Sequence, residues 1–152
     1  MNRASDCRIF PGPIDQTVSA SITKEVAMKY LCLVYSDEQL LHSLPDSPRD
    51  EECQACGDAL RSSGRLIAAE ALESVRTATT LRMRNGQLSI TDGPFAETKE
   101  QLAGFYLIEA RDLNEAMQIA ARIPPVRVGA VEVRPVRTLN VPADVPTAFE
   151  RN

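Results

Sequence analysis

The segment Met28-Lys29-Tyr30-Leu31-Cys32-Leu33-Val34-Tyr35 is where an ordered pattern begins in this chain. Its apolar, aromatic and β-branched side chains predict a strand over Lys29–Tyr35. Stretches of similar character predict the remaining strands, at Leu66–Leu72, Thr77–Arg84, Gln87–Thr91, Gly104–Ala110 and Ala130–Val136. Between the third and fourth of these, Asn85-Gly86 is a strong signal for a two-residue hairpin.

Two helices are predicted between the strands. The first begins with Ser47 as N-cap and Pro48 at the first helical position, and Gly64 supplies its left-handed stop. The second spans Leu113–Arg122, because Asp112-Leu113-Asn114-Glu115 resembles a capping box. Residues 37–45 are expected to form a loop or a short helical turn.

The resulting order is β-α-β-β-β-α-β. Two helices cannot cover both faces of such a sheet, so the remaining face has to be buried in another way. Pairing two sheets face to face in a homodimer is the economical solution. We therefore expect an α+β chain, a ferredoxin-like protomer of the dimeric α/β barrel type.

The ordered domain is expected over residues 28–139. Residues 1–27 show no sustained periodicity, and are either a natural disordered extension or a mis-assigned start with Met28 as the true initiator. Lys24-Glu25-Val26 can be encoded by a ribosome-binding sequence, which supports the second interpretation. Residues 140–152 contain Pro142 and Pro146, lack periodicity and are expected to form a tail.

Composition excludes several classes of protein. The net charge of -4 and the few aromatic residues (Tyr 3, Phe 4) argue against a nucleic-acid partner. The longest apolar run, Tyr30–Tyr35, is far shorter than the roughly 20 residues of a membrane span. Four cysteines do not form a dense disulfide framework, so we expect a cytoplasmic protein.

No cofactor or metal is expected. The glycines from Gly57 onward are scattered and form no phosphate-binding loop. A zinc site would have to combine Cys53-x-x-Cys56 with Cys32 and the single histidine, His42, at a spacing that matches no strong motif. Cys53 and Cys56 share a helix face with Leu60, which favours core packing, although a redox pair near the helix start stays open.

The turn Asp92-Gly93-Pro94-Phe95 is the first candidate site. As a purely structural turn, it would have Gly93 at positive φ and Phe95 plugging the core. As a functional turn, it would place Asp92 at a pocket rim as a catalytic general acid or base, with Phe95 as a pocket residue. Glu97 and Lys99 follow on a loop, where they either tune Asp92 and line the pocket or form part of a solvated surface.

Three further residues are pocket candidates. Tyr35 ends the first strand, Tyr106 lies in the strand Gly104–Ala110, and Glu70 lies among alanines in Leu66–Leu72. The two tyrosines and Glu70 could orient a ligand. The alternative for Glu70 is a strand edge or an ion pair with Arg82 or Arg134.

The block from Thr91-Asp92-Gly93-Pro94-Phe95 through Glu97, Lys99 and Gly104 to Glu109 resembles the signature of the DGPF branch of the YCII-related family. Met28-Lys29-Tyr30 and Val131-Glu132-Val133-Arg134-Pro135 extend the resemblance to about residues 28–139. It implies a dimeric α/β barrel. Similarity to the wider group also implies a His–Asp pair with the histidine on the first helix, where this chain has Cys53 and Cys56 instead.

Two functions follow as expectations from this resemblance. The first is a small-molecule-binding barrel, either a binding protein or an enzyme acting on a small cyclic or aromatic compound through an acid/base carboxylate. The alternative is a non-catalytic regulatory or interaction protein associated with an ECF-type sigma factor, because genes of this family often lie beside those of such factors.

Overall fold

A four-stranded antiparallel sheet organises the chain in a computed structural model that describes residues 27–140. The strand order is β2-β5-β1-β6, which confirms the α+β class and is compatible with a ferredoxin-like protomer. The strands are β1 (Met28–Ser36), β2 (Leu66–Ala71), β5 (Gln101–Ala110) and β6 (Ala130–Pro135). The expected extension at 1–27 and tail at 140–152 lie, apart from Ala27 and Asn140, outside the described residues.

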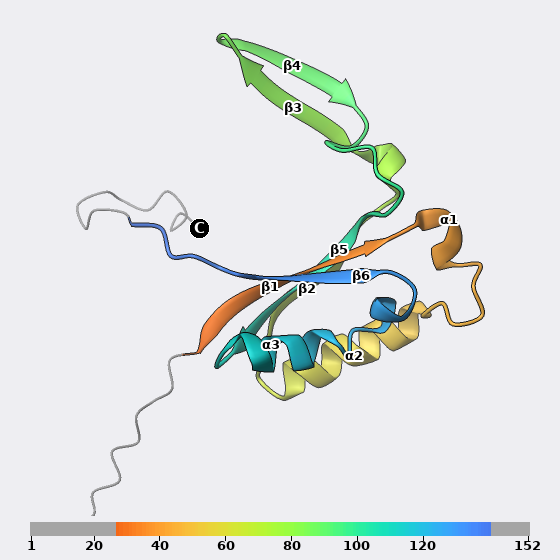
Figure 1. Cartoon of the computed structure of the whole chain (residues 1–152), viewed down its shortest axis with the longest axis vertical. Coiled ribbons are helices and arrows are strands. Elements are labelled where there is room, and N and C mark those ends of the chain that lie inside the picture. The colour runs from red at the N-terminus through yellow and green to blue at the C-terminus, as the bar shows by residue number, and fades with distance from the viewer. Residues whose placement is uncertain (1–26, 141–152) are drawn as a thin grey trace, which may run out of the picture.

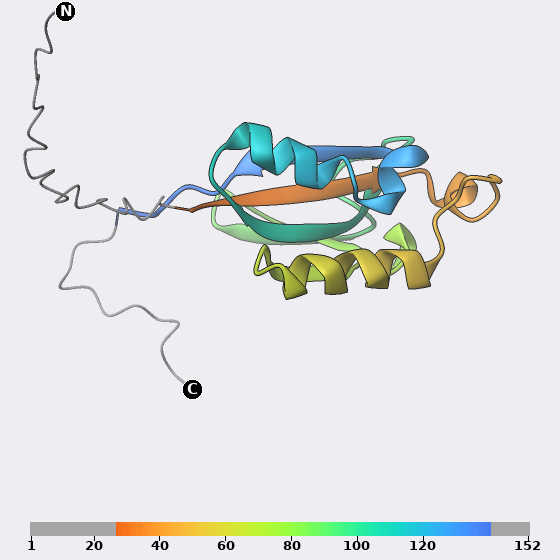
Figure 2. The same ribbon diagram turned by 90° about the horizontal axis from the view of Figure 1, so that it is seen from below.

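The helices α2 (Asp50–Ser62) and α3 (Leu113–Ala120) lie side by side on one face of the sheet (Figure 2). The strands turn alternate side chains toward them, because successive residues of a strand point to opposite faces. The core between the two layers consists of Tyr30, Cys32, Val34, Leu60, Tyr106, Ile108, Ala110, Ala116, Ile119, Ala120 and Ile123.

The start of α2 differs from the prediction. Arg49 is the N-cap, without a side-chain cap, and the helix begins at Asp50. The Ser47 hydroxyl instead accepts a hydrogen bond from the Leu44 N–H, and Pro48 is buried. The expectation of Ser47 as N-cap was wrong because its side chain closes the preceding turn.

The other helix signals are confirmed. Gly64 has a φ of 70°, as the stop after α2 requires. The Asp112 carboxylate accepts from the Glu115 N–H at 2.8 Å and caps α3. The Glu115 carboxylate accepts from the N–H of Arg111, one residue before the cap, and forms an ion pair with Arg65 at 2.7 Å. Glu115 thus joins α3 to the start of β2.

Short helical turns complete the connections. α1 (Glu38–Leu41) lies in the segment expected to be a loop or helical turn, and η2 (Pro124–Arg127) leads into β6. η1 (Val75–Thr77) takes up Thr77, the first residue of the strand predicted at 77–84, and the strand itself begins at Thr79. The Glu38 carboxylate accepts hydrogen bonds from the Ser74 hydroxyl and the Val75 N–H, so α1 is fastened to η1.

The strands β3 (Thr79–Arg84) and β4 (Gln87–Asp92) form a separate two-stranded sheet, which we call the arm (Figure 1). Its turn has Asn85 and Gly86 at φ of 51° and 73°, which confirms the predicted hairpin. The Gly93 N–H donates to the Ala78 carbonyl at 2.7 Å and closes the base. The arm rises on the side of the sheet opposite the helices.

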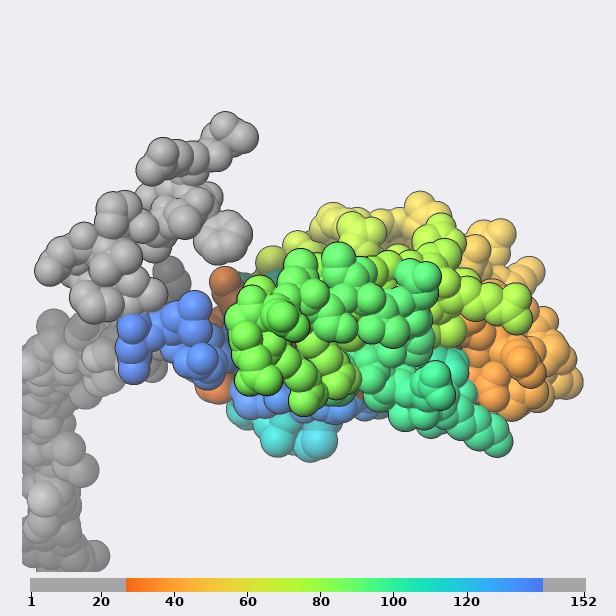
Figure 3. Space-filling view, turned by 90° about the horizontal axis from the view of Figure 1, so that it is seen from above, coloured from red at the N-terminus to blue at the C-terminus, as the bar shows by residue number. Residues whose placement is uncertain are grey.

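No helix covers the second face of the sheet among the residues described. We call it the open face. Figure 3 looks onto this side of the molecule, with the arm in green. The strand register places five half-buried apolar residues there: Leu31, Leu33, Tyr35, Phe105 and Leu107.

Gly104 allows β2 to approach β5. A Cβ at this position would lie 2.7 Å from the Glu70 carbonyl oxygen. We expect Gly104→Ala to lower the free energy of unfolding by about 1–3 kcal/mol, because the backbones must separate. Gly57→Ala in α2 is the control, because the new Cβ would meet only Leu66 Cδ2, at 4.0 Å. Since this change also replaces a glycine inside a helix, it should raise the free energy of unfolding by up to about 1 kcal/mol. Urea unfolding measures both, and equal effects would contradict the close-approach argument.

Glu115 makes stability depend on pH. The Arg111 N–H, followed by the Arg111 side chain and Arg65, holds the pKa of the Glu115 carboxyl below its usual value. A lowered folded-state pKa gives stability that is present above the unfolded-state pKa and is lost as pH falls through the folded-state pKa. The stability difference between wild type and Glu115→Gln should therefore shrink from pH about 7 to about 3. Glu73→Gln, an exposed carboxylate, is the control, and an unchanged Glu115→Gln difference across the range would contradict the argument.

Candidate functional site

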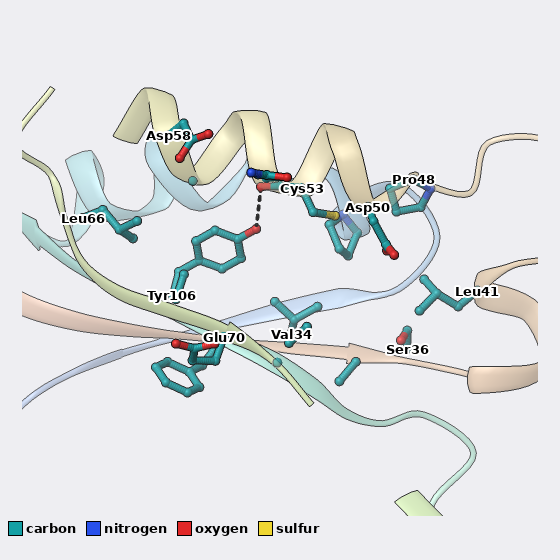
Figure 4. Close-up of a pocket in the computed structure, with 18 of the residues that line it drawn as sticks. Val34, Ser36, Leu41, Pro48, Asp50, Cys53, Asp58, Leu66, Glu70 and Tyr106 are labelled. Carbon is teal, nitrogen blue, oxygen red and sulfur yellow. Dashed lines mark hydrogen bonds between the residues drawn. The ribbon is translucent and has the colours of Figure 1, made fainter. Parts of the chain in front are cut away.

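A cavity of about 450 Å³ lies between α2 and the β2 side of the sheet (Figure 4). This volume lies within the range of small-molecule sites. Small residues create it: Gly57 on the inner side of α2, and Ala69, Ala71 and Gly104 where β2 meets β5. Larger apolar residues from β1, α1, β2 and the segments around α2 and η2 complete the wall: Val34, Leu41, Pro48, Leu66 and Pro125.

Tyr106 stands inside the cavity. Its ring points from β5 toward α2, and its hydroxyl donates to the Cys53 carbonyl oxygen at 3.5 Å (Figure 4). The residue is buried, and burial, followed by the proximity of Cys53 and Cys56, raises the pKa of the Tyr106 hydroxyl to about 12. Tyr106 therefore keeps its proton at neutral pH and acts as a donor rather than as a base.

Ser36 brings a hydroxyl to the cavity wall with no hydrogen-bond partner among residues 27–140. It is the last residue of β1, on the same side as Val34, and only 1% exposed. Buried hydroxyls in native proteins nearly always have a partner, and an unsatisfied one destabilises by about 1–3 kcal/mol. Such a group facing a cavity is suited to hydrogen-bond a ligand.

The two cysteines of α2 lie in different environments. Cys56 packs against the core, and its thiol lies 3.8 Å from the Arg122 carbonyl oxygen. Cys53 lines the cavity. Burial raises the pKa of both thiols, and for Cys53 the nearby Asp50 raises it further. A redox pair or thiolate nucleophile needs a lowered pKa, so this environment favours packing and polar contact for Cys53.

The rim of the cavity carries an excess of negative charge. Asp50 and Asp58 lie on α2, and Glu70 lies at the β2 edge. Arg61 also lines the cavity, but its guanidinium is paired with Asp58 at 3.0 Å. His42 completes the mouth beside α1. With one of three carboxylates paired, the rim attracts neutral and cationic molecules better than anions.

Two of the residues expected to form a pocket line this cavity, Tyr106 and Glu70. Tyr106 points into it, whereas the register places Glu70 opposite Phe105, so its side chain belongs to the open face and only the edge of the cavity. Tyr35 is half-buried on the open face and does not line the cavity. Of the two structural alternatives for Glu70, the structure shows the strand edge, because β2 is an outer strand of the sheet; an ion pair with Arg82 or Arg134 is not among the salt bridges of the described residues.

The other candidates lie at the base of the arm. Asp92 ends β4, and Asp92, Glu97 and Lys99 are all exposed and lie outside the cavity. Phe95 is 77% exposed, with the Arg82 guanidinium 5.0 Å from its ring centre. The expectation that Phe95 plugs the core was therefore wrong. Gly93 does have the expected positive φ, 106°. The acid/base role of Asp92 stays a prediction.

Sequence reasoning did not select Ser36, Asp50 and Cys53 as a group. A signal for Ser36 does exist, since it continues the alternation of Tyr30, Cys32 and Val34 and is the polar end of an inward-facing row. Asp50 and Cys53 follow only once α2 is known to lie over β2 and β5. In the described part of the chain, no three His, Cys, Asp or Glu side chains group as a metal site. No helix in that part is long and apolar enough to cross a membrane.

A comparison with protein-family models identifies the family of this chain. The family model described as the YCII-related domain matches residues 28–140, which include every element from β1 to β6. An uncharacterized protein of Rhizobium meliloti (strain 1021) is 36% identical over 126 residues. This alignment covers 79% of the chain and 100% of that protein.

The unpartnered hydroxyl of Ser36 has a measurable consequence for stability. We expect Ser36→Ala to raise the free energy of unfolding of the ligand-free protein by about 1 kcal/mol, because it removes a buried group that makes no hydrogen bond. Ser63→Ala is the matched control: that hydroxyl donates to the Leu60 carbonyl oxygen at 2.9 Å, so its loss should lower stability by about 0.5–1.5 kcal/mol. If urea unfolding shows Ser36→Ala to be the more destabilising of the two, the hydroxyl has a structural partner and the ligand argument is wrong.

Proposed function

Because this chain belongs to the YCII-related domain family, we propose that it is a small-molecule-binding protein of the dimeric α/β barrel type, with its ligand in the cavity between α2 and the sheet. The observation that carries the proposal is the mainly apolar cavity itself, which holds the Tyr106 hydroxyl and has the buried, unpartnered Ser36 hydroxyl in its wall. Within the family, the Asp92-Gly93-Pro94-Phe95 turn supports assignment to the DGPF branch.

The chemistry of the cavity suggests the class of ligand. Its wall is mainly apolar, which suits a small cyclic or aromatic compound. Ser36 and Tyr106 offer hydroxyl groups, and Arg61, the one arginine among the lining residues, is paired with Asp58 and not with Asp50 or Glu70. A neutral or cationic ring compound fits this set better than a carboxylic acid does.

An acid/base reaction on such a ligand would need a carboxylate near it. Asp50 lies at the cavity, whereas Asp92 lies on the arm of the same chain. We therefore propose ligand binding without assigning a reaction. Asp50 and Asp92 are the two carboxylates to compare in an activity assay.

The proposed dimer buries the open face. Five half-buried apolar residues on one side of a sheet favour a second layer over water, and a second copy supplies an identical surface.

We propose a cytoplasmic location on separate grounds. Cys32, Cys53 and Cys56 are free thiols in the described part of the chain, which suits a reducing compartment.

A thermal-shift screen tests the binding proposal. Neutral and cationic ring compounds should stabilise the wild type more than cyclic or aromatic acids of the same size. A ligand at 100 times its dissociation constant adds about 2.7 kcal/mol, an easily measured shift. Asp50→Asn should weaken the response to cations, and Asp46→Asn, an exposed acid outside the cavity, is the matched control.

Other outcomes separate the alternatives. A ligand response that is lost in Asp92→Asn but kept in Asp50→Asn would move the site to the arm turn. If a broad panel gives no response, the small-molecule proposal is wrong, and a protein partner such as a sigma factor becomes the function to examine.

A further inference from the structure

The arm carries an apolar row that nothing in the described chain covers. Leu81 pairs with Ile90 and Met83 with Leu88 across its two strands, so these four side chains share one side. All four are more than half exposed: Leu81 59%, Ile90 62%, Met83 66% and Leu88 54%. The opposite side is polar, with Arg82, Ser89 and their neighbours.

A two-stranded sheet of this kind is marginally stable on its own in water. A contiguous row of large apolar side chains on it marks an interaction surface rather than the ordinary scatter of exposed residues. The arm therefore lacks a partner that would cover this row.

The place of the arm narrows the choice of partner. It rises from the end of the sheet on the side of the open face (Figures 1 and 3). A molecule that covers Leu31, Leu33 and Phe105 on that face consequently lies alongside the arm. One and the same partner can cover both surfaces.

Charge favours a second copy of this chain as that partner. The arm, residues 79–92, contains two bases, Arg82 and Arg84, and one acid, Asp92, at its base. The sheet side that bears the open face has three acids against two bases, and one base, Arg134, already lies 3.6 Å from Glu132. These charged residues are Lys29, Glu70, Glu109, Glu132 and Arg134. Each copy thus supplies an arm with an excess of one base, its arginines on the side away from the apolar row, and a sheet side with an excess of one acid, a balance that is compatible with a two-fold interface.

We propose that the apolar row of each arm packs on the open-face side of the second subunit, so that the two arms clasp the dimer reciprocally. This inference rests on the dimer of the proposed function and adds which segment holds it together.

Sedimentation velocity over a dilution series tests the clasp. Met83→Ser with Leu88→Ser, one cross-strand pair of the row, should raise the dimer dissociation constant at least tenfold. Gln87→Ala with Ser89→Ala is the matched control. Both residues lie on the polar side of the arm, in β4, and their replacement should leave the dimer dissociation constant unchanged. A dimeric wild type with an unaffected Met83/Leu88 variant overturns the clasp alone. A wild type that is monomeric at every concentration overturns both the clasp and the dimer.

A direct measurement does not depend on the stability of the variants. A photo-reactive benzoylphenylalanine replaces Ile90, and heavy-isotope-labelled and unlabelled chains are mixed before illumination. Mixed-isotope cross-links to β1 or β5 of the other chain are expected. Cross-links confined to one isotope pattern within a single chain, or linking only the two arms, would overturn the proposed packing.

Discussion

The pairing of β1 with β5 is the interaction on which the rest of the structure depends. These two strands lie in the centre of the sheet, and their inward rows bring Tyr30, Cys32 and Val34 beside Tyr106 and Ile108. Both helices pack on this combined surface. Because the side-chain period of a strand is two, a shift of one residue in this register would turn the core row toward the open face. The register of one strand pair thus decides what is core and what is surface.

The cavity is a local departure from that close packing. α3 contributes Ala116, Ile119 and Ala120 to a filled core, whereas α2 presents Gly57 and a half-buried Cys53 above Ala69 and Gly104. Small residues on both layers leave space where larger ones would have closed it. Gly104 has a second reason to be small, since β2 passes too close for a Cβ. The same residue therefore permits the sheet to form and keeps the cavity open.

Local signals explain what the sequence could predict. The apolar rows of β1 and β5, the Asp112 cap and the Asn85-Gly86 turn depend on residues close in the chain, and the structure confirms each of them. The prediction for the start of α2 was wrong because the Ser47 hydroxyl can either cap the helix or close the preceding turn at Leu44. The local sequence does not indicate which of the two it does. The exposure of Phe95 and the meeting of Ser36, Asp50 and Tyr106 depend on how whole elements pack. No periodicity in one segment contains that information, so only the cavity candidates Tyr106 and Glu70 could be selected in advance.

The strand order also governs how the chain folds. In the four-stranded sheet, no strand pairs with its immediate neighbour in sequence: β1 joins β5 and β6, and β2 joins β5. Every such pairing closes a long loop before it gains a hydrogen bond, and folds rich in distant pairings form slowly. Only β3 and β4 can pair locally, within the microseconds typical of hairpins. The hairpin can therefore pair transiently well before the chain has a sheet, and two chains made close together can meet through these hairpins before either has completed its core.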